Sequence, residues 1–180
     1  LPLRRNFIGQ YGWLRRTLFG LYSSRVILGK DGFFFYNSDA SADGFTTKDF
    51  RGKTQPDDKT LRVWQRVLAE RQAWLTERHV SYLIVAAPNK HTIYADQLPH
   101  EELRRRGSKV RLDALVELVR SATPTTLTWP VLDLRPSLLA KKSAGLLYHK
   151  TDSHWNQLGA FYGDQAIVER LRAHYPQLRQ

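Results

Sequence analysis

The chain contains no cysteine, which excludes disulfide bonds, a thiol nucleophile and cysteine metal ligands. No apolar run is long enough to cross a bilayer, so the sequence predicts no transmembrane helix. Acidic residues are scarce: 17 Asp and Glu stand against 28 Lys and Arg, and residues 1–30 contain neither Asp nor Glu. The formal charge of +11 predicts an anionic partner, such as nucleic acid, an anionic membrane surface or an acidic polysaccharide.

The 180 residues, of which 42% are hydrophobic, suffice for one domain with a substantial core. We expect residues 1–50 to form a basic amphipathic lead-in and a hairpin, and residues 51–180 to form an α/β domain. Aromatic residues interleave with basic ones in the lead-in, but no nucleic-acid motif accompanies them, so we expect no nucleic-acid partner. Because the sequence begins at Leu1, we also expect a signal peptide or membrane anchor upstream.

Hydrophobic periodicity and turn residues predict strands that alternate with helices. The expected elements are a helix over 1–24, a hairpin over 26–36 that turns at Asp31-Gly32, a loop over 37–56, a helix from Asp57 or Asp58 to about Arg78, a buried strand over 80–87, a loop over 89–94, a helix capped by Ser108, a strand over 131–134, a helix from Pro136 through Lys142, a strand over 146–148 and a helix that includes Phe161 and Leu171. This order predicts a parallel sheet with right-handed crossovers, covered by helices.

The strongest candidate site is the pair Asp152 and His154, on the loop before the last expected helix. Residues two apart in an extended segment point the same way, so the Asp152 carboxylate can bind His154 Nδ1 and leave Nε2 facing a cleft as a general base. Alternatively, Asp152 caps the following helix and His154 is a core residue. A metal site of His149, Asp152 and His154 is a further alternative, although no second cluster supports it.

Four other residues are candidates for substrate binding. Lys90 and His91 follow the expected strand over 80–87, at the strand end where open α/β sheets bind ligands; alternatively, they are solvated loop residues. Tyr148 and Trp155 have rings that stack on sugars, or else pack in the core. We expect no metal and no cofactor.

From residue 26 onward the sequence resembles the AlgJ/AlgX-type proteins of alginate O-acetylation, which have an SGNH-hydrolase-like domain. The matching pieces are Val26-Ile27-Leu28-Gly29-Lys30-Asp31-Gly32, Leu83-Ile84-Val85-Ala86-Ala87-Pro88-Asn89-Lys90, Ile93-Tyr94 with Leu98-Pro99, Val131-Leu132-Asp133-Leu134, and Thr151-Asp152-Ser153-His154-Trp155-Asn156-Gln157-Leu158-Gly159-Ala160. The last block is the most specific.

The resemblance implies an SGNH-hydrolase-like (flavodoxin-like) α/β fold and a Ser-His-Asp triad in which Asp152 orients His154. It also implies that the serine follows the Asp-x-His block. Neither Gly-Asp-Ser nor Gly-x-Ser-x-Gly occurs in the chain, and Ser38, Ser137 and Ser143 lack a strand-to-helix turn context. We therefore expect a domain that is incomplete at its C-terminus, lacks the nucleophile and is inactive alone.

By the same resemblance, the activity is acetyl transfer to the hydroxyls of an anionic exopolysaccharide of the alginate type. The expected location is the periplasm, with an anchor in the inner membrane through the upstream segment. The expected partners are that polymer, a membrane-embedded acetyl donor protein and other polymer-secretion proteins. Two alternatives stay open: a carbohydrate acetylesterase of the same fold, and a non-catalytic module for polysaccharide binding or assembly.

Overall fold

The computed structural model describes residues 24–40, 44–121, 131–173 and 175–177. The predicted helix over 1–24 lies almost wholly outside these residues. In chain order the helices and strands are β1 (Val26–Leu28), β2 (Phe34–Tyr36), α2 (Phe45–Phe50), α3 (Asp58–Thr76), β3 (Ile84–Ala86), α4 (Lys90–Ile93), α5 (His100–Arg104), α6 (Arg111–Ser121), β4 (Val131–Asp133), α7 (Arg135–Ala140) and α8 (Gln157–Arg172). Short 3-10 turns cover Lys30–Gly32, Ser38–Ala40, Ala95–Gln97 and Lys142–Ala144.

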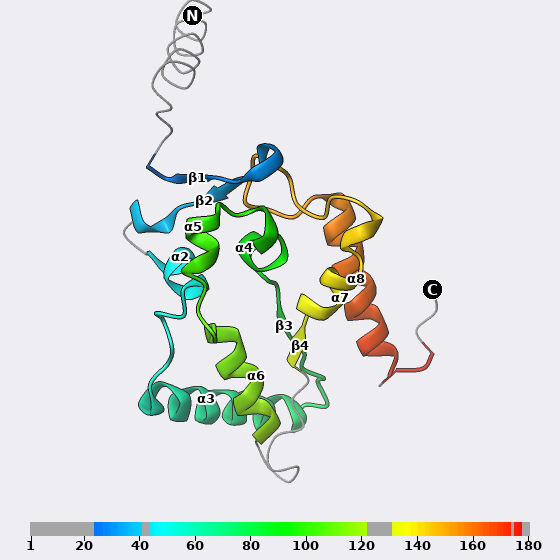
Figure 1. Ribbon diagram of the computed structural model, residues 1–180. Coiled ribbons are helices and arrows are strands. Elements are labelled where there is room, and N and C mark those ends of the chain that lie inside the picture. Colours follow the sequence, from blue (N-terminus) through cyan, green and yellow to red (C-terminus); the bar gives the residue numbers. More distant parts are fainter. Residues whose placement is uncertain (1–23, 41–43, 122–130, 174, 178–180) are drawn as a thin grey trace, which may run out of the picture.

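The predicted hairpin is confirmed. β1 pairs antiparallel with β2, with Val26 opposite Tyr36. Asp31 and Gly32 occupy the turn with φ of +51° and +77°, the left-handed region that Gly and Asp tolerate best. The hairpin lies at the top of Figure 1, directly above α4.

The predicted loop over 37–56 is partly wrong, because it contains α2. Its start is fixed by Gly44, whose φ of +55° reverses the chain. Thr47 of this helix is buried, and its main-chain amide donates to Ser38 Oγ over 2.8 Å. A six-residue helix held by such contacts has too short a pattern to stand out in the sequence.

The helix predicted from Asp57 or Asp58 is confirmed as α3. The Asp57 carboxylate caps it by accepting from the Thr60 amide over 2.8 Å. α3 lies across the bottom of Figure 1 with α6 beside it. Among the described residues neither helix buries a side chain fully, and Trp74 of α3 is 55% exposed.

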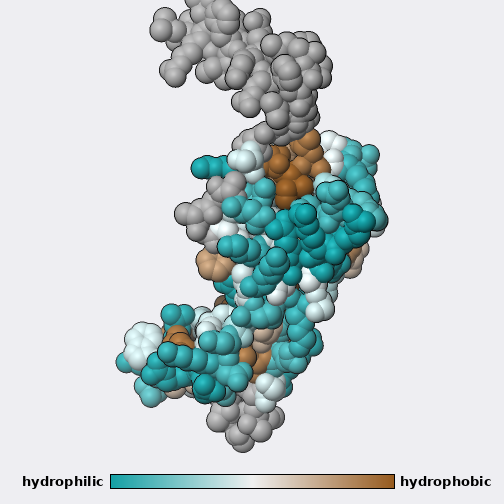
Figure 2. All heavy atoms as spheres, turned by 60° about the vertical axis from the view of Figure 1, so that its left-hand side comes forward, coloured by the Kyte–Doolittle hydropathy of each residue, from teal (hydrophilic) through white to brown (hydrophobic). Residues whose placement is uncertain are grey.

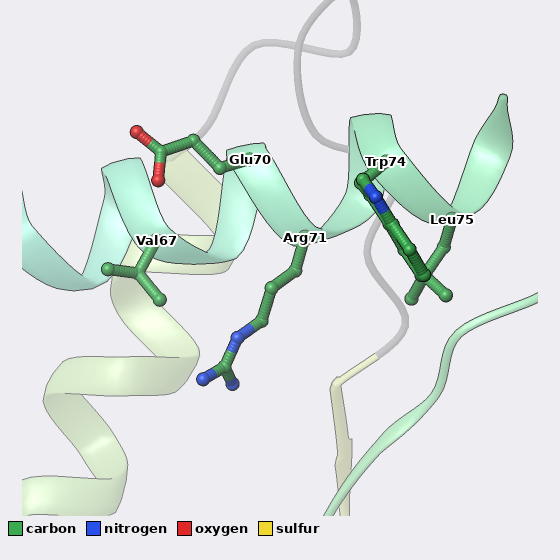
Figure 3. A pocket seen from close by; sticks show the side chains of 5 residues that line it. All are labelled: Val67, Glu70, Arg71, Trp74 and Leu75. Atoms are coloured by element: carbon green, nitrogen blue, oxygen red, sulfur yellow. The ribbon is translucent and has the colours of Figure 1, made fainter.

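A hollow of about 410 Å³ lies along α3. Figure 3 shows that Arg71, Trp74 and Leu75 extend to one side of the helix, whereas Glu70 extends to the other. The Arg78 guanidinium lies 4.0 Å from the centre of the Trp74 ring and covers part of it. The apolar side of α3 is therefore partly open to solvent.

The predicted parallel pairing is confirmed, but with a smaller sheet. β3 and β4 pair in parallel, with Val85 opposite Leu132. The sequence predicted a buried strand over 80–87; β3 covers three of those residues, and Val85 at its centre is 37% exposed. In the described part of the chain this parallel sheet has two strands, so the outer edges of β3 and β4 have no neighbouring strand there.

The structure also tests the predictions for the segments over 89–94, after Ser108, from Pro136 and at the end of the chain. The segment over 89–94, predicted as a loop, contains the one-turn helix α4. The second predicted helix begins at Arg111, three residues after its expected cap Ser108, and the short α5 before it was missed. The helix with Pro136 in its first turn and the long last helix are confirmed as α7 and α8.

The core lies between the hairpin, α4, α7 and the segment that leads into α8. Its buried residues are Phe33, Phe35, Phe50, Ile93, Tyr94, Ala95, Leu98, Leu134, Leu138, Leu147, Tyr148 and Ala166. Residues from the hairpin and from the expected α/β domain thus share one core. Figure 2 shows a mostly hydrophilic face with one larger hydrophobic area toward the upper end of the described residues.

Candidate functional site

The candidate residues lie on a tight loop that a single β-bridge closes. Tyr148 and Trp155 form this antiparallel bridge, and the His149 amide donates to the His154 carbonyl over 3.2 Å. The strand predicted over 146–148 is thus reduced to a bridge. All six residues over 149–154 are exposed. We call residues 149–154 the Asp–His loop.

Asp152 and His154 are in direct contact, as their spacing predicted. Asp152 Oδ1 lies 2.6 Å from His154 Nδ1 and also accepts from the His154 amide over 2.8 Å. Because a carboxylate only accepts, Nδ1 carries the hydrogen and Nε2 of the neutral ring is left as the proton acceptor. The backbone and ring hydrogen bonds from His154 hold the pKa of Asp152 below its usual value.

The pair stands on an open surface. The side chain of His154 is 81% exposed and that of Asp152 is 55% exposed. The core alternative for His154 is therefore wrong, and the described residues form no cleft that encloses its ring. The capping alternative for Asp152 is also wrong, because the side chain of Asn156 caps α8 by accepting from the Gly159 amide over 3.0 Å.

Lys90 is buried, with 2% exposure, at the start of α4. Its Nζ donates over 2.7 Å to the carbonyls of Phe34, His149 and Lys150, and lies 3.1 Å from that of Asp152. Burial lowers the pKa of Lys90 to about 8, and the Asp152 carboxylate acts in the opposite direction. Lys90 therefore faces the Asp–His loop from inside and is not presented to a substrate in solvent.

His91 is also a core residue, with 3% exposure. Its ring packs at centroid distances of 5.2 Å from Phe35 and 5.9 Å from Phe50. Burial lowers the pKa of His91 to about 4, although a hydrogen bond to the Tyr36 backbone opposes this shift. A neutral imidazole within the core is a packing residue, so the prediction that His91 binds substrate is wrong.

The two aromatic candidates support the loop from beneath. Tyr148 is buried, and its hydroxyl donates to the Pro88 carbonyl over 2.5 Å. Burial raises the pKa of Tyr148 to about 12, so its hydroxyl keeps its proton. Trp155 is half-buried, and its ring lies against Gly163 of α8. The buried Tyr148 therefore does not present an open ring face as a platform for a sugar.

Gly159 allows α8 to approach the loop closely. A Cβ at Gly159 would lie 2.1 Å from the Leu147 carbonyl oxygen, which accepts a hydrogen bond from the Asn156 amide over 2.9 Å. Three residues of the most specific block thus have local structural roles. Trp155 forms the bridge, Asn156 caps α8, and Gly159 allows the close approach of α8 to Leu147.

A cavity of about 340 Å³ opens at the carboxyl end of β3. Ala87, Pro88 and Asn89 line it, together with the guanidinium-bearing residues Arg111 and Arg135. Arg135 is held by Asp113 and Asp133, each over 2.7 Å. Pro88 links this cavity to the residue that precedes the Asp–His loop, because its carbonyl accepts a hydrogen bond from the Tyr148 hydroxyl. The location matches the ligand sites of open α/β sheets.

The serines considered as nucleophiles do not lie in a nucleophile turn. Ser38 is fully buried, and its Oγ lies 2.6 Å from Thr47 Oγ1. Ser137 lies within α7, and Ser143 lies in the 3-10 turn that follows α7.

Within the described residues, the His, Asp and Glu side chains form no cluster of three that could hold a metal ion. In the same part of the chain, no helix combines the length and the apolar character that crossing a bilayer requires.

Sequence reasoning placed Asp152 and His154 together but missed what holds them. Lys90 was treated as a ligand-binding candidate because of its position after a strand. Its carbonyl partners lie 56 to 62 positions away. No local sequence pattern predicts contacts over such a separation. The Asn156 cap was readable in principle, because Asn before a helical pattern is a start signal.

Comparison with known proteins shows which family the chain belongs to. Residues 26–180 match the family model "SGNH hydrolase-like domain, acetyltransferase AlgX". The chain is 26% identical over 172 residues to "Probable alginate O-acetylase AlgJ" of Pseudomonas aeruginosa, a match that covers 96% of this chain and 38% of that protein.

Two solved structures share the fold. The O-acetyltransferase domain of Pseudomonas putida AlgJ superposes with a TM-score of 0.54 at 21% identity, covering 86% of this chain and 49% of that chain. Bacillus cereus PatB1 gives a TM-score of 0.54 at 17% identity, covering 86% and 44%. The chain thus spans less than half the length of each of these relatives. On the family match over residues 26–180, the chain belongs to the AlgX family of SGNH-hydrolase-like acetyltransferase domains.

Proposed function

We propose that this chain is part of a periplasmic polysaccharide O-acetyltransferase and that Asp152 and His154 are its general-base pair. The observation that carries the proposal is the 2.6 Å contact between His154 Nδ1 and Asp152. It leaves Nε2 of an exposed ring free to accept a proton, as the base of a Ser-His-Asp triad must. Membership of an acetyltransferase family gives the reaction class.

The proposed transfer has two steps. A serine hydroxyl attacks the acetyl carbonyl of the donor, while His154 Nε2 takes its proton and passes it to the leaving oxygen. A sugar hydroxyl then attacks the acetyl-serine, His154 takes that proton, and the regenerated serine receives it. In both steps the Asp152 carboxylate stabilises the imidazolium that forms.

We place the serine outside these 180 residues. Ser38, Ser137 and Ser143 lack the turn that a nucleophile requires, and the relatives with this fold are more than twice as long as the part that this chain matches. The hydrogen-bond donors of an oxyanion hole would come largely from the part of the protein that carries this serine. On this proposal the chain alone is inactive.

For the acceptor we propose an anionic polymer of the alginate type, with acetyl groups supplied through a membrane-embedded partner and other polymer-secretion proteins nearby. The name of the Pseudomonas aeruginosa relative supports the polymer, and the charge of +11 favours an anionic one. A periplasmic location with an upstream anchor in the inner membrane fits such a polymer.

The test is product analysis of a longer version that contains the serine, incubated with an isotopically labelled acetyl donor and oligouronates. Labelled acetyl on sugar hydroxyls supports a transferase. Release of the label only as acetate would identify an esterase of the same fold. Binding of the oligosaccharide without turnover would identify a non-catalytic module.

A further inference from the structure

The Asp–His loop is tied to the rest of the protein by one buried ammonium group. Lys90 Nζ meets three of its carbonyls, those of His149, Lys150 and Asp152, and a fourth from Phe34 of β2. An ammonium has three hydrogens, so four acceptors at 2.7 to 3.1 Å use its whole donor capacity. The carbonyls converge on Lys90 as they would on a bound cation.

The loop has little else to hold it in place. All of its side chains are exposed, so core packing does not fix its conformation. Apart from the contacts of Lys90, the loop is anchored where the Phe34 amide donates to the Lys150 carbonyl over 2.7 Å, where Lys150 Nζ donates to the Asp31 carbonyl over 2.9 Å, and where the bridge closes at Tyr148. The carbonyl of Lys150 therefore binds both Lys90 and the hairpin.

A buried charge is a costly way to fill space, because an apolar side chain would pack without a desolvation penalty. Here the rings of Phe33 and Phe35, each 5.1 Å from Nζ, offer their π faces to the ammonium. The surroundings of Lys90 thus suit a cation.

We propose that Lys90 is a positioning residue of the acyl-transfer site, whose ammonium fixes the main chain of the Asp–His loop so that Asp152 orients His154. This inference rests on the proposed function of the pair. Lys90 itself touches neither substrate nor the reacting atoms. Its effect passes through the carbonyl of Asp152 to the carboxylate of the same residue.

The direct test is NMR on the 180-residue chain with three substitutions. Lys90→Met removes the donor at similar length, Lys90→Gln keeps a neutral donor, and Lys150→Met is the matched control. Lys150 lies in the same loop, but its ammonium is exposed and bonds one carbonyl, that of Asp31, over 2.9 Å. The readouts are the ring ¹⁵N shifts of His154, which report which nitrogen carries the hydrogen, and hydrogen exchange of the His149 and His154 amides.

Lys90→Met should abolish the Nδ1–H signature of His154 and speed exchange of both amides by about tenfold or more, while α8 keeps its protection. Lys90→Gln should show a partial loss, and Lys150→Met none. An unchanged His154 signature in a folded Lys90→Met chain would overturn the proposal. Unfolding of the whole chain by both Lys90 substitutions would also overturn it, because a tether of this loop predicts local release.

Activity separates this inference from the proposed function. In a longer version that transfers acetyl groups, Lys90→Met should lower kcat by about 100-fold with little change in KM, because misplacement by about 1 Å has that cost. Transfer at the unaltered rate in Lys90→Met would contradict the positioning role while leaving the proposed function intact. If the unsubstituted protein transfers nothing, the proposed function fails, and the NMR result still decides whether Lys90 orders the loop.

Discussion

Lys90 Nζ lies 3.1 Å from the main-chain oxygen of Asp152, although 62 positions separate the two residues. The ammonium thus connects the start of α4 to the loop that carries the candidate base. A spacing of two brings Asp152 and His154 close together, whereas on the proposed role of Lys90 their hydrogen bond also depends on this distant lysine.

The first prediction concerns the buried imidazole of His91. Its pKa is lowered from 6.5 to about 4 in the folded chain, so between these values the unfolded chain binds a proton that the folded chain does not. The free energy of unfolding should therefore fall as pH drops from 6.5 to 4, by about 3 kcal/mol from this residue. Urea denaturation at several pH values measures the change.

The control is His91→Phe, which keeps an aromatic ring between Phe35 and Phe50. His91 Nε2 is buried and has no hydrogen-bond partner among the described residues, so the substitution costs no contact at that atom. The stability of this variant should depend less on pH between 6.5 and 4. Equal slopes in both proteins would show that His91 accepts a proton without cost in the folded state.

A second prediction concerns the contact between α8 and the Asp–His loop. Gly159→Ala places a methyl group 2.1 Å from the Leu147 carbonyl oxygen, so the helix or the loop must move. We expect a loss of about 3 kcal/mol in the free energy of unfolding, because main-chain atoms yield less easily than a flexible side chain. The midpoint of urea denaturation measures this loss.

Gly163→Ala on the same helix is the matched control. Its added methyl group meets the Trp155 ring at 3.2 Å, a contact that a small rotation relieves, and Ala also favours a helix over Gly by about 1 kcal/mol. Its stability should stay close to that of the unsubstituted chain. If both substitutions had the same effect, the close approach at Gly159 would not be the cause.

These contacts show how far the sequence predicts the structure. The hairpin, α3, the parallel pairing and the long last helix all carry local signals, such as Asp31-Gly32 at the turn and Asp57 at a helix start. α2, α4 and α5 have four to six residues each, too few for a periodic pattern, and tertiary contacts hold them.

In the candidate site too, contacts between neighbouring residues were predicted and contacts between distant segments were missed. The spacing of two brings Asp152 and His154 within reach of each other, and the sequence therefore predicted their contact. Burial of Lys90, His91 and Tyr148 depends on segments more than 40 positions away, so a polar residue after a strand was mistaken for an exposed one. The partner that holds a loop is visible only once the chain is folded.

A third prediction concerns the basic surface. The chain should be retained on an immobilised polyuronate at low salt and released as salt rises, because exposed charges are screened within about 10 Å at 0.1 M. A neutral glucan matrix is the control. Equal retention on that glucan would argue against a charge-based interaction, and equal retention on DNA would show that the charge does not select a uronate.

The fourth prediction concerns the nucleophile. The 180-residue chain should form no acyl-enzyme with an activated acetyl ester, because Asp152 and His154 supply no attacking oxygen for a two-step transfer. A longer version that contains the serine should gain one acetyl group, as measured by intact mass. A stoichiometric acetyl adduct on a serine of the short chain would return attention to Ser38, Ser137 and Ser143.

The most direct test of the proposed base is the rate of acetyl transfer by the longer version with and without His154→Ala. The account predicts a loss of about 10⁴-fold in kcat, as for other triad residues, with an unchanged denaturation midpoint because the ring is 81% exposed. Transfer by His154→Ala at the rate of the unsubstituted protein would contradict the assignment of His154 as the base.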